Sequence, residues 1–197
     1  VTRGRMKKSL FLIPGFRQRA SDKCFVWLIK FLKEKGFVVV KVPVRWDRRL
    51  MADYVNDFER FYKDNKSQTN YILGFSWGAV IAFLSAPRLK PRKIYLCSLS
   101  PYFKEDVVGT KPWVQKIEGK QRIAEKRKFS GREIAKKFSI PSVVFYGEIE
   151  GRRYPLLKKR CEETVRLARN SRLVVVKNAP HKINHPEYVK AIKQIFI

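Results

Sequence analysis

The apolar residues of this chain fall into short runs separated by longer amphipathic stretches. The runs are rich in valine, isoleucine and leucine and are bounded by glycine, proline or charged residues, which is typical of buried strands. Strands are therefore expected at residues 10–13, 37–44, 71–73, 94–99, 142–146 and 173–177.

The stretches between these runs carry apolar residues at helical spacing. In the first stretch Phe25, Leu28 and Leu32 share one helix face, and Gly36 stands just past the expected end. Other helices are expected around residues 54–62, at 79–86, at 155–169 and from residue 186 onward. Strands that alternate with helices predict an α/β fold, with a mainly parallel six-stranded sheet flanked by helices.

This alternation breaks between residues 101 and 140. The segment is rich in charged residues, and only one helix is expected in it, beginning near Gly131 and including Ile134, Ala135 and Phe138. We interpret residues 101–140 as a cap-like insertion within a single domain that spans residues 1–197, because no repeat, low-complexity tract or linker divides the chain.

The composition is that of a globular domain, because 45% apolar residues are enough to bury a core. The three cysteines, Cys24, Cys97 and Cys161, form neither a CxxC pair nor a cluster with histidine, which predicts a reducing cytoplasm and no structural metal. The basic amino end precedes an apolar run that Pro14 and Gly15 stop too early for a signal peptide. Since no run approaches the length of a membrane span, a soluble cytoplasmic protein without a transmembrane segment is expected.

A net charge of +27, from 44 Lys and Arg against 17 Asp and Glu, creates a positive field that attracts nucleic acid, anionic lipid or anionic substrates. The basic residues run through the whole chain and form no separate tail. Basic residues that are spread along a whole chain more often reflect how an organism's proteins stay soluble than a groove that binds nucleic acid. No specific nucleic-acid partner is therefore expected.

The segment Gly74-Phe75-Ser76-Trp77-Gly78 matches the GxSxG pattern of a nucleophile elbow. A serine hydroxyl is a weak nucleophile unless it is held exposed beside a base, and a sharp strand-to-helix turn holds it so. The pattern alone is weak, but here it lies between an expected strand and an expected helix. Ser76 is therefore the candidate nucleophile.

The chain has two histidines that could serve as the base, His181 and His185. His181 follows the last expected strand, in a loop from which its ring can reach toward Ser76. His185 precedes Pro186 at the start of the final helix, where a capping or packing role is expected. These positions favour His181 as the catalytic base.

A carboxylate between the serine and the histidine should fix the imidazole tautomer. The strand at 142–146 is followed by Gly147-Glu148-Ile149-Glu150, and either acid could serve. Glu150 is favoured because it would lie in the loop proper, with Glu148 nearer the strand as the alternative. The oxyanion would be held by two backbone N–H groups, those of Trp77 after the nucleophile and of Phe16 in the loop after the first strand.

Together these motifs resemble the α/β-hydrolase superfamily, in particular its small bacterial and archaeal members, over nearly the whole chain. The resemblance implies a mainly parallel sheet, an acyl-enzyme mechanism, no cofactor and a cap after the strand that follows the elbow. Two positions depart from the usual pattern, because Pro14 stands where a histidine is common and the acid is glutamate instead of aspartate.

The predicted function is a serine hydrolase that cleaves a carboxylic ester or thioester with a Ser76–His181–Glu150 triad. The segment between Lys111 and Ile140 has ten Lys or Arg against three Glu, which would attract an anionic small-molecule acyl substrate. The alternative is a non-catalytic binding protein on the same scaffold that uses its charge on nucleic acid or anionic membrane.

Overall fold

A computed structural model describes residues 7–47 and 50–196 of the chain. Six parallel strands form one sheet in the order β2-β1-β3-β4-β5-β6, so the predicted parallel six-stranded α/β architecture is confirmed. The strands are β1 (Lys8–Ile13), β2 (Phe37–Lys41), β3 (Thr69–Phe75), β4 (Lys93–Cys97), β5 (Ser142–Gly147) and β6 (Ser171–Val176).

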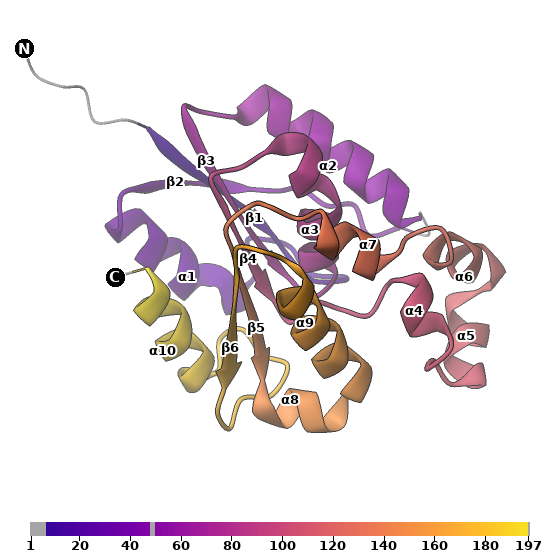
Figure 1. The fold of residues 1–197 in the computed structure, drawn as a ribbon. Coiled ribbons are helices and arrows are strands. Elements are labelled where there is room, and N and C mark those ends of the chain that lie inside the picture. The colour runs from indigo at the N-terminus through magenta and orange to yellow at the C-terminus, as the bar shows by residue number, and fades with distance from the viewer. Residues whose placement is uncertain (1–6, 48–49, 197) are drawn as a thin grey trace, which may run out of the picture.

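Helices cover both faces of this sheet (Figure 1). One face packs against α1 (Lys23–Glu34) and α10 (Pro186–Ile195), and the other against α2 (Met51–Asn65), α3 (Trp77–Leu89) and α9 (Pro155–Leu167). The two faces carry separate hydrophobic clusters, because successive side chains of a strand point to opposite sides. In β1, for example, Phe11 belongs to one cluster, and Leu10 and Leu12 belong to the other.

Strand β2 ends earlier than the apolar pattern predicted. The valine-rich run extends to Val44, but the strand stops at Lys41. Val42 still donates a backbone hydrogen bond to Leu12 (3.0 Å), whereas Pro43 has no N–H with which to continue the ladder.

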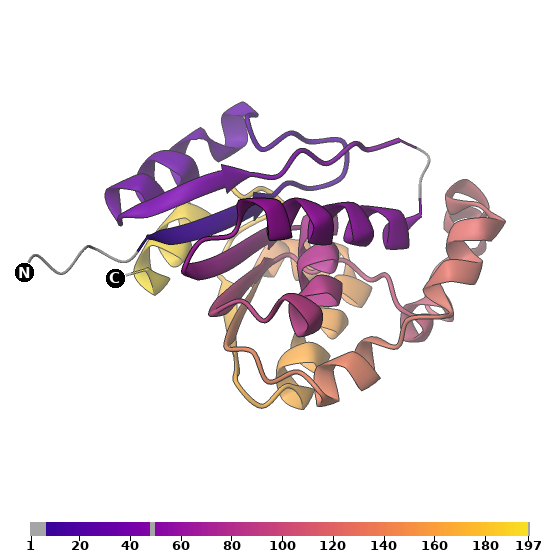
Figure 2. The ribbon, with the colours of Figure 1, turned by 90° about the horizontal axis from the view of Figure 1, so that it is seen from above.

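The segment between β4 and β5 contains more helix than the single one predicted near Gly131. It contains four short helices: α4 (Lys104–Val107), α5 (Pro112–Glu118), α6 (Lys120–Lys126) and α7 (Gly131–Lys136). Figure 2 shows α5 and α6 standing away from the sheet, while α7 returns toward it.

Buried charged groups hold this β4–β5 segment in place. The Glu125 carboxylate accepts hydrogen bonds from the N–H groups of Met51 and Ala52 at the start of α2, both 2.8 Å. Arg160 of α9, 1% exposed, forms an ion pair with Asp106 of α4 at 2.7 Å. These contacts join residues far apart in sequence, so no local pattern predicts them.

A second difference concerns residues 147–150, which were expected as a loop; residues from Glu148 onward form the short helix α8 (Glu148–Arg153). Glu150 is its third residue and accepts a hydrogen bond from the Gly147 N–H (2.9 Å), as an acid at this position of a helix start can. Within residues 7–47 and 50–196, no helix combines the length and apolar composition that crossing a membrane requires.

Candidate active site

The elbow at Ser76 lies between the end of β3 and the start of α3. Ser76 has φ 56° and ψ −117°, a backbone conformation that is costly for a residue with a side chain. A Cβ added at Gly74 would lie 2.2 Å from the Gly78 carbonyl oxygen, and one at Gly78 would lie 2.3 Å from that of Ile13. Both flanking positions therefore require glycine.

The Ser76 side chain lies at the floor of a cavity and is 9% exposed. Its Oγ lies 3.2 Å from the Ser100 Oγ, just past the carboxyl end of β4. Among the described residues, this is the hydrogen-bond partner of the Ser76 hydroxyl, and no bond to His181 is formed in this structure.

Glu150 and His181 lie in direct contact. One carboxylate oxygen of Glu150 is hydrogen-bonded to Nδ1 of His181, and Glu150 is 1% exposed. The loop that carries His181 is fixed to α8, because the Ala179 carbonyl accepts from the N–H groups of Ile149 and Glu150 at 3.1 and 3.3 Å. A Cβ at Gly147 would lie 2.1 Å from that carbonyl oxygen, so only glycine permits this approach.

The other candidate acid, Glu148, lies away from the histidine. Its side chain is 42% exposed, accepts from the Asn178 N–H at 3.1 Å and lies 3.9 Å from Arg152. The structure thus brings Glu150, and not Glu148, to His181.

The sequence analysis missed Ser98, which bonds to the second oxygen of Glu150, and Tyr188, which bonds to Ser98. The Ser98 hydroxyl donates to this Glu150 oxygen at 2.9 Å and also lies 3.0 Å from the Tyr188 hydroxyl. Tyr188 is fully buried, and burial raises the pKa of its phenol, which stays protonated as a donor. The sequence carried no usable signal for Ser98, because the residue falls inside the strand expected at 94–99, whereas β4 ends at Cys97 and places Ser98 at the sheet edge where sites of parallel sheets form.

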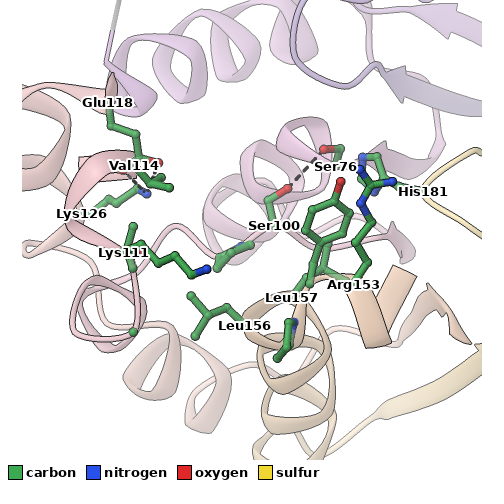
Figure 3. Close-up of a pocket in the computed structure, with 15 residues that line it drawn as sticks. Ser76, Ser100, Lys111, Val114, Glu118, Lys126, Arg153, Leu156, Leu157 and His181 are labelled. Atoms are coloured by element: carbon green, nitrogen blue, oxygen red, sulfur yellow. Dashed lines mark hydrogen bonds and ion pairs between the residues drawn. The ribbon is translucent and has the colours of Figure 1, made fainter. Parts of the chain in front are cut away.

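The His181 ring stacks against Phe75, with centroids 4.9 Å apart and planes inclined by 33°. Since Nδ1 is bound to the carboxylate, Nε2 is the nitrogen left for a substrate or a nucleophile. Figure 3 shows His181 beside Ser76 at one end of the cavity that both residues line. His185 instead begins α10 without a side-chain capping bond, and its Nδ1 is buried without a partner among the described residues.

The two expected oxyanion residues, Phe16 and Trp77, lie side by side with ring centroids 4.6 Å apart. The Trp77 N–H belongs to the first turn of α3, where no intrahelical acceptor exists. Within the described part of the chain, neither the Phe16 nor the Trp77 N–H has a hydrogen-bond acceptor. Neither residue is among those that line the cavity beside Ser76.

The cavity above Ser76 has a volume of about 640 Å³ and opens between α8, α9 and the β4–β5 segment. Its walls are mostly apolar and include Val114, Leu156 and Leu157. The Tyr154 side chain also lines it. Among residues 7–47 and 50–196, no group of three or more His, Cys, Asp or Glu side chains is arranged to hold a metal ion.

Comparison with known proteins gives a clear result only at the level of structure. No protein-family model matches the sequence, and no curated protein matches it in sequence. Est1E from Butyrivibrio proteoclasticus superposes with a TM-score of 0.80 at 13% identity, covering 99% of this chain and 88% of that one.

Two further solved structures are similar over most of their length. The esterase EaEST from Exiguobacterium antarcticum has a TM-score of 0.73 at 14% identity, over 98% of this chain and 93% of that one. MenH from S. aureus has a TM-score of 0.71 at 13% identity, over the same shares. Likenesses at these identities concern the fold, and with the strand order and the elbow geometry they show that this chain has the α/β-hydrolase fold.

Proposed function

We propose that the protein is a serine hydrolase that cleaves a carboxylic ester or thioester, with Ser76 as nucleophile, His181 as base and Glu150 as the acid that orients it. The observation that carries the proposal is the buried Glu150 bonded to His181, whose ring lines the same cavity as the elbow serine. This arrangement has the roles and the chain order of a hydrolase triad.

In the first half of the reaction, Nε2 of His181 takes the Ser76 proton while the Ser76 oxygen bonds to the substrate carbonyl carbon. The carbonyl oxygen becomes an oxyanion, which accepts hydrogen bonds from the Phe16 and Trp77 N–H groups. Collapse breaks the bond to the alcohol or thiol, which leaves with the proton from His181, and an acyl-serine remains.

In the second half, His181 takes a proton from water while the water oxygen attacks the acyl carbon. Collapse of this second tetrahedral species returns the proton to Ser76 and releases the carboxylic acid. Glu150 stays ionised throughout and stabilises the imidazolium formed in each half. No cofactor enters this chemistry.

Two structural relatives are consistent with this proposal, since EaEST is an esterase and Est1E has been solved with bound ferulic acid. The fold alone leaves the reaction open, because a bromoperoxidase from Bacillus anthracis shares it. The hydrolase proposal therefore depends on the residues around Ser76. We further propose that the β4–β5 segment acts as a cap of this single domain, because Lys111, Val114 and Lys126 from it line the cavity.

The test is covalent labelling of Ser76 by a fluorophosphonate probe together with hydrolysis of short p-nitrophenyl esters. Ser76→Ala should abolish both. Ser85→Ala, which removes another buried hydroxyl from the same helix α3, is the matched control and should leave both unchanged. If folded wild-type protein shows neither labelling nor turnover, the hydrolase proposal fails and a binding role for the +27 charge takes its place.

A further inference from the structure

We infer that the cavity selects amphiphilic substrates that carry an anionic group, and that Lys111 and Arg153 bind this group at the cavity mouth. The preference among substrates rests on the proposed hydrolase function. The binding of an anionic group rests on the cavity alone.

The charges along the cavity wall are unequally compensated. The lining includes three cationic side chains, Lys111, Lys126 and Arg153, and one anionic side chain, Glu118. The Lys126 amine contacts both Glu118 carboxylate oxygens, at 2.6 and 2.7 Å, and its side chain is only 3% exposed. Lys126 and Glu118 therefore form a closed pair, and the excess positive charge belongs to the other two residues.

Lys111 and Arg153 have no such compensation. In the described part of the chain, neither side chain forms an ion pair or a hydrogen bond, and the Arg153 guanidinium only lies over the Tyr154 ring, 5.5 Å from its centroid. Figure 3 shows Lys111 extending into the cavity from the cap side and Arg153 extending toward Ser76 and His181 from the opposite side. Two positive groups thus converge on one space from separate elements.

The rest of the wall determines what kind of anion fits. Val114, Leu156 and Leu157 lie on the wall with these two cations, and the polar groups of Ser76 and Ser100 lie at the floor. An apolar chain can cover the aliphatic wall while its charged end meets Lys111 or Arg153, both of which are solvent-exposed. The fitting ligand is an apolar chain that ends in a carboxylate or another small anion, several atoms from the scissile carbonyl.

The kinetic experiment compares the mono-p-nitrophenyl ester of suberic acid with its methyl ester, which has the same chain without the charge. Wild-type protein should show a severalfold higher kcat/KM for the anionic ester at low salt, and salt should reduce this preference. Lys111→Met and Arg153→Met should each lower the anionic-to-neutral ratio by about fivefold, as expected for partly exposed ion pairs. Equal kcat/KM for the two esters in the wild type overturns the inference.

Matched control variants come from the same elements. Lys116→Met removes an exposed lysine of α5, and Arg152→Met removes the neighbouring arginine of α8, and neither residue lines the cavity. Both should keep the wild-type ratio. If they lower it as much as Lys111→Met and Arg153→Met do, the preference comes from the overall field of the protein and the assigned site is wrong.

A binding experiment separates this inference from the hydrolase proposal. Calorimetry on Ser76→Ala should detect octanoate binding with at least fivefold higher affinity than octanamide, and Lys111→Met and Arg153→Met should remove the difference. Selective octanoate binding without esterase activity would support the anion site and reject the hydrolase. Esterase activity with equal binding of octanoate and octanamide would support the hydrolase and reject the anion site.

Discussion

The substitution Glu150→Gln keeps the size of the side chain and replaces one carboxylate oxygen by an amide nitrogen. In the wild type one oxygen accepts from His181, and the other accepts from Ser98 and from the Gly147 N–H, both at 2.9 Å. A carboxamide has one acceptor oxygen and cannot serve both sides. If that oxygen faced His181, the NH₂ group would face the Gly147 N–H, leaving a buried donor unsatisfied at a cost of about 1–3 kcal/mol.

The amide is therefore expected to turn its oxygen to Gly147 and Ser98 and its NH₂ group to His181. Nδ1 of His181 must then accept a hydrogen bond, which puts the ring proton on Nε2. A ring with that tautomer cannot take the Ser76 proton, so kcat should fall by about 10⁴-fold, the loss seen when a triad acid is amidated. The fold should survive, because shape and packing are kept.

Initial rates of p-nitrophenyl butyrate hydrolysis and urea unfolding measure these two effects separately. Glu148→Gln is the control, because that exposed side chain contributes at most about 1 kcal/mol to stability and should change kcat by less than about twofold. The reasoning is refuted if Glu150→Gln keeps more than a tenth of wild-type kcat, or if Glu148→Gln is the variant that loses activity.

Two further predictions concern stability. Gly78→Ala should lower the free energy of unfolding by about 1–3 kcal/mol or more, because the added Cβ would lie 2.3 and 2.4 Å from the Ile13 and Pro14 carbonyl oxygens. If urea unfolding is unchanged, the predicted clash is wrong. Burial raises the pKa of Tyr62 from 10 to about 12, so the stability that its neutral form contributes is complete below pH 10 and is lost as pH rises toward 12. Tyr62→Phe should weaken the pH dependence of urea unfolding in this range, and an unchanged dependence would refute this role.

Much of the fold follows from the sequence, because the information for it is local. Short valine-rich runs that alternate with amphipathic helices specify a parallel sheet, and glycines around Ser76 specify a turn. The helices α4, α5 and α6 escaped prediction because they have at most seven residues and depend on contacts such as Glu125 with Met51, 74 positions apart.

The candidate site also has some residues that local sequence indicates and some that depend on the folded sheet. Residue type and chain order were enough to name Ser76 and His181 as candidates, which the structure places on one cavity, because few side chains can serve as nucleophile and base. The contact of Ser98 with Glu150 spans 52 positions and depends on neighbouring strands of the folded sheet. The sequence pattern placed Ser98 inside the strand expected at residues 94–99, so nothing in it indicated that contact.

Backbone strain is concentrated at the edge of the sheet where the site lies. Five non-glycine residues in the described part of the chain have positive φ, and four of them, Arg17, Ser76, Ser98 and Asn178, follow the carboxyl ends of strands. Such conformations cost on the order of 1–3 kcal/mol each and persist only where surrounding contacts enforce them.

The enforcing contacts at the two serines are continuations of the sheet. The Ser76 N–H donates to the Cys97 carbonyl at 2.8 Å, and the Ser98 N–H donates to the Phe145 carbonyl at 2.7 Å. Each strained residue is thus held by the next strand, which fixes Ser76 at the cavity and Ser98 against Glu150. Because the same ladder that stabilises the sheet also fixes the backbone of both serines, the proposed nucleophile and the residue that bonds to its proposed acid are positioned before any substrate binds.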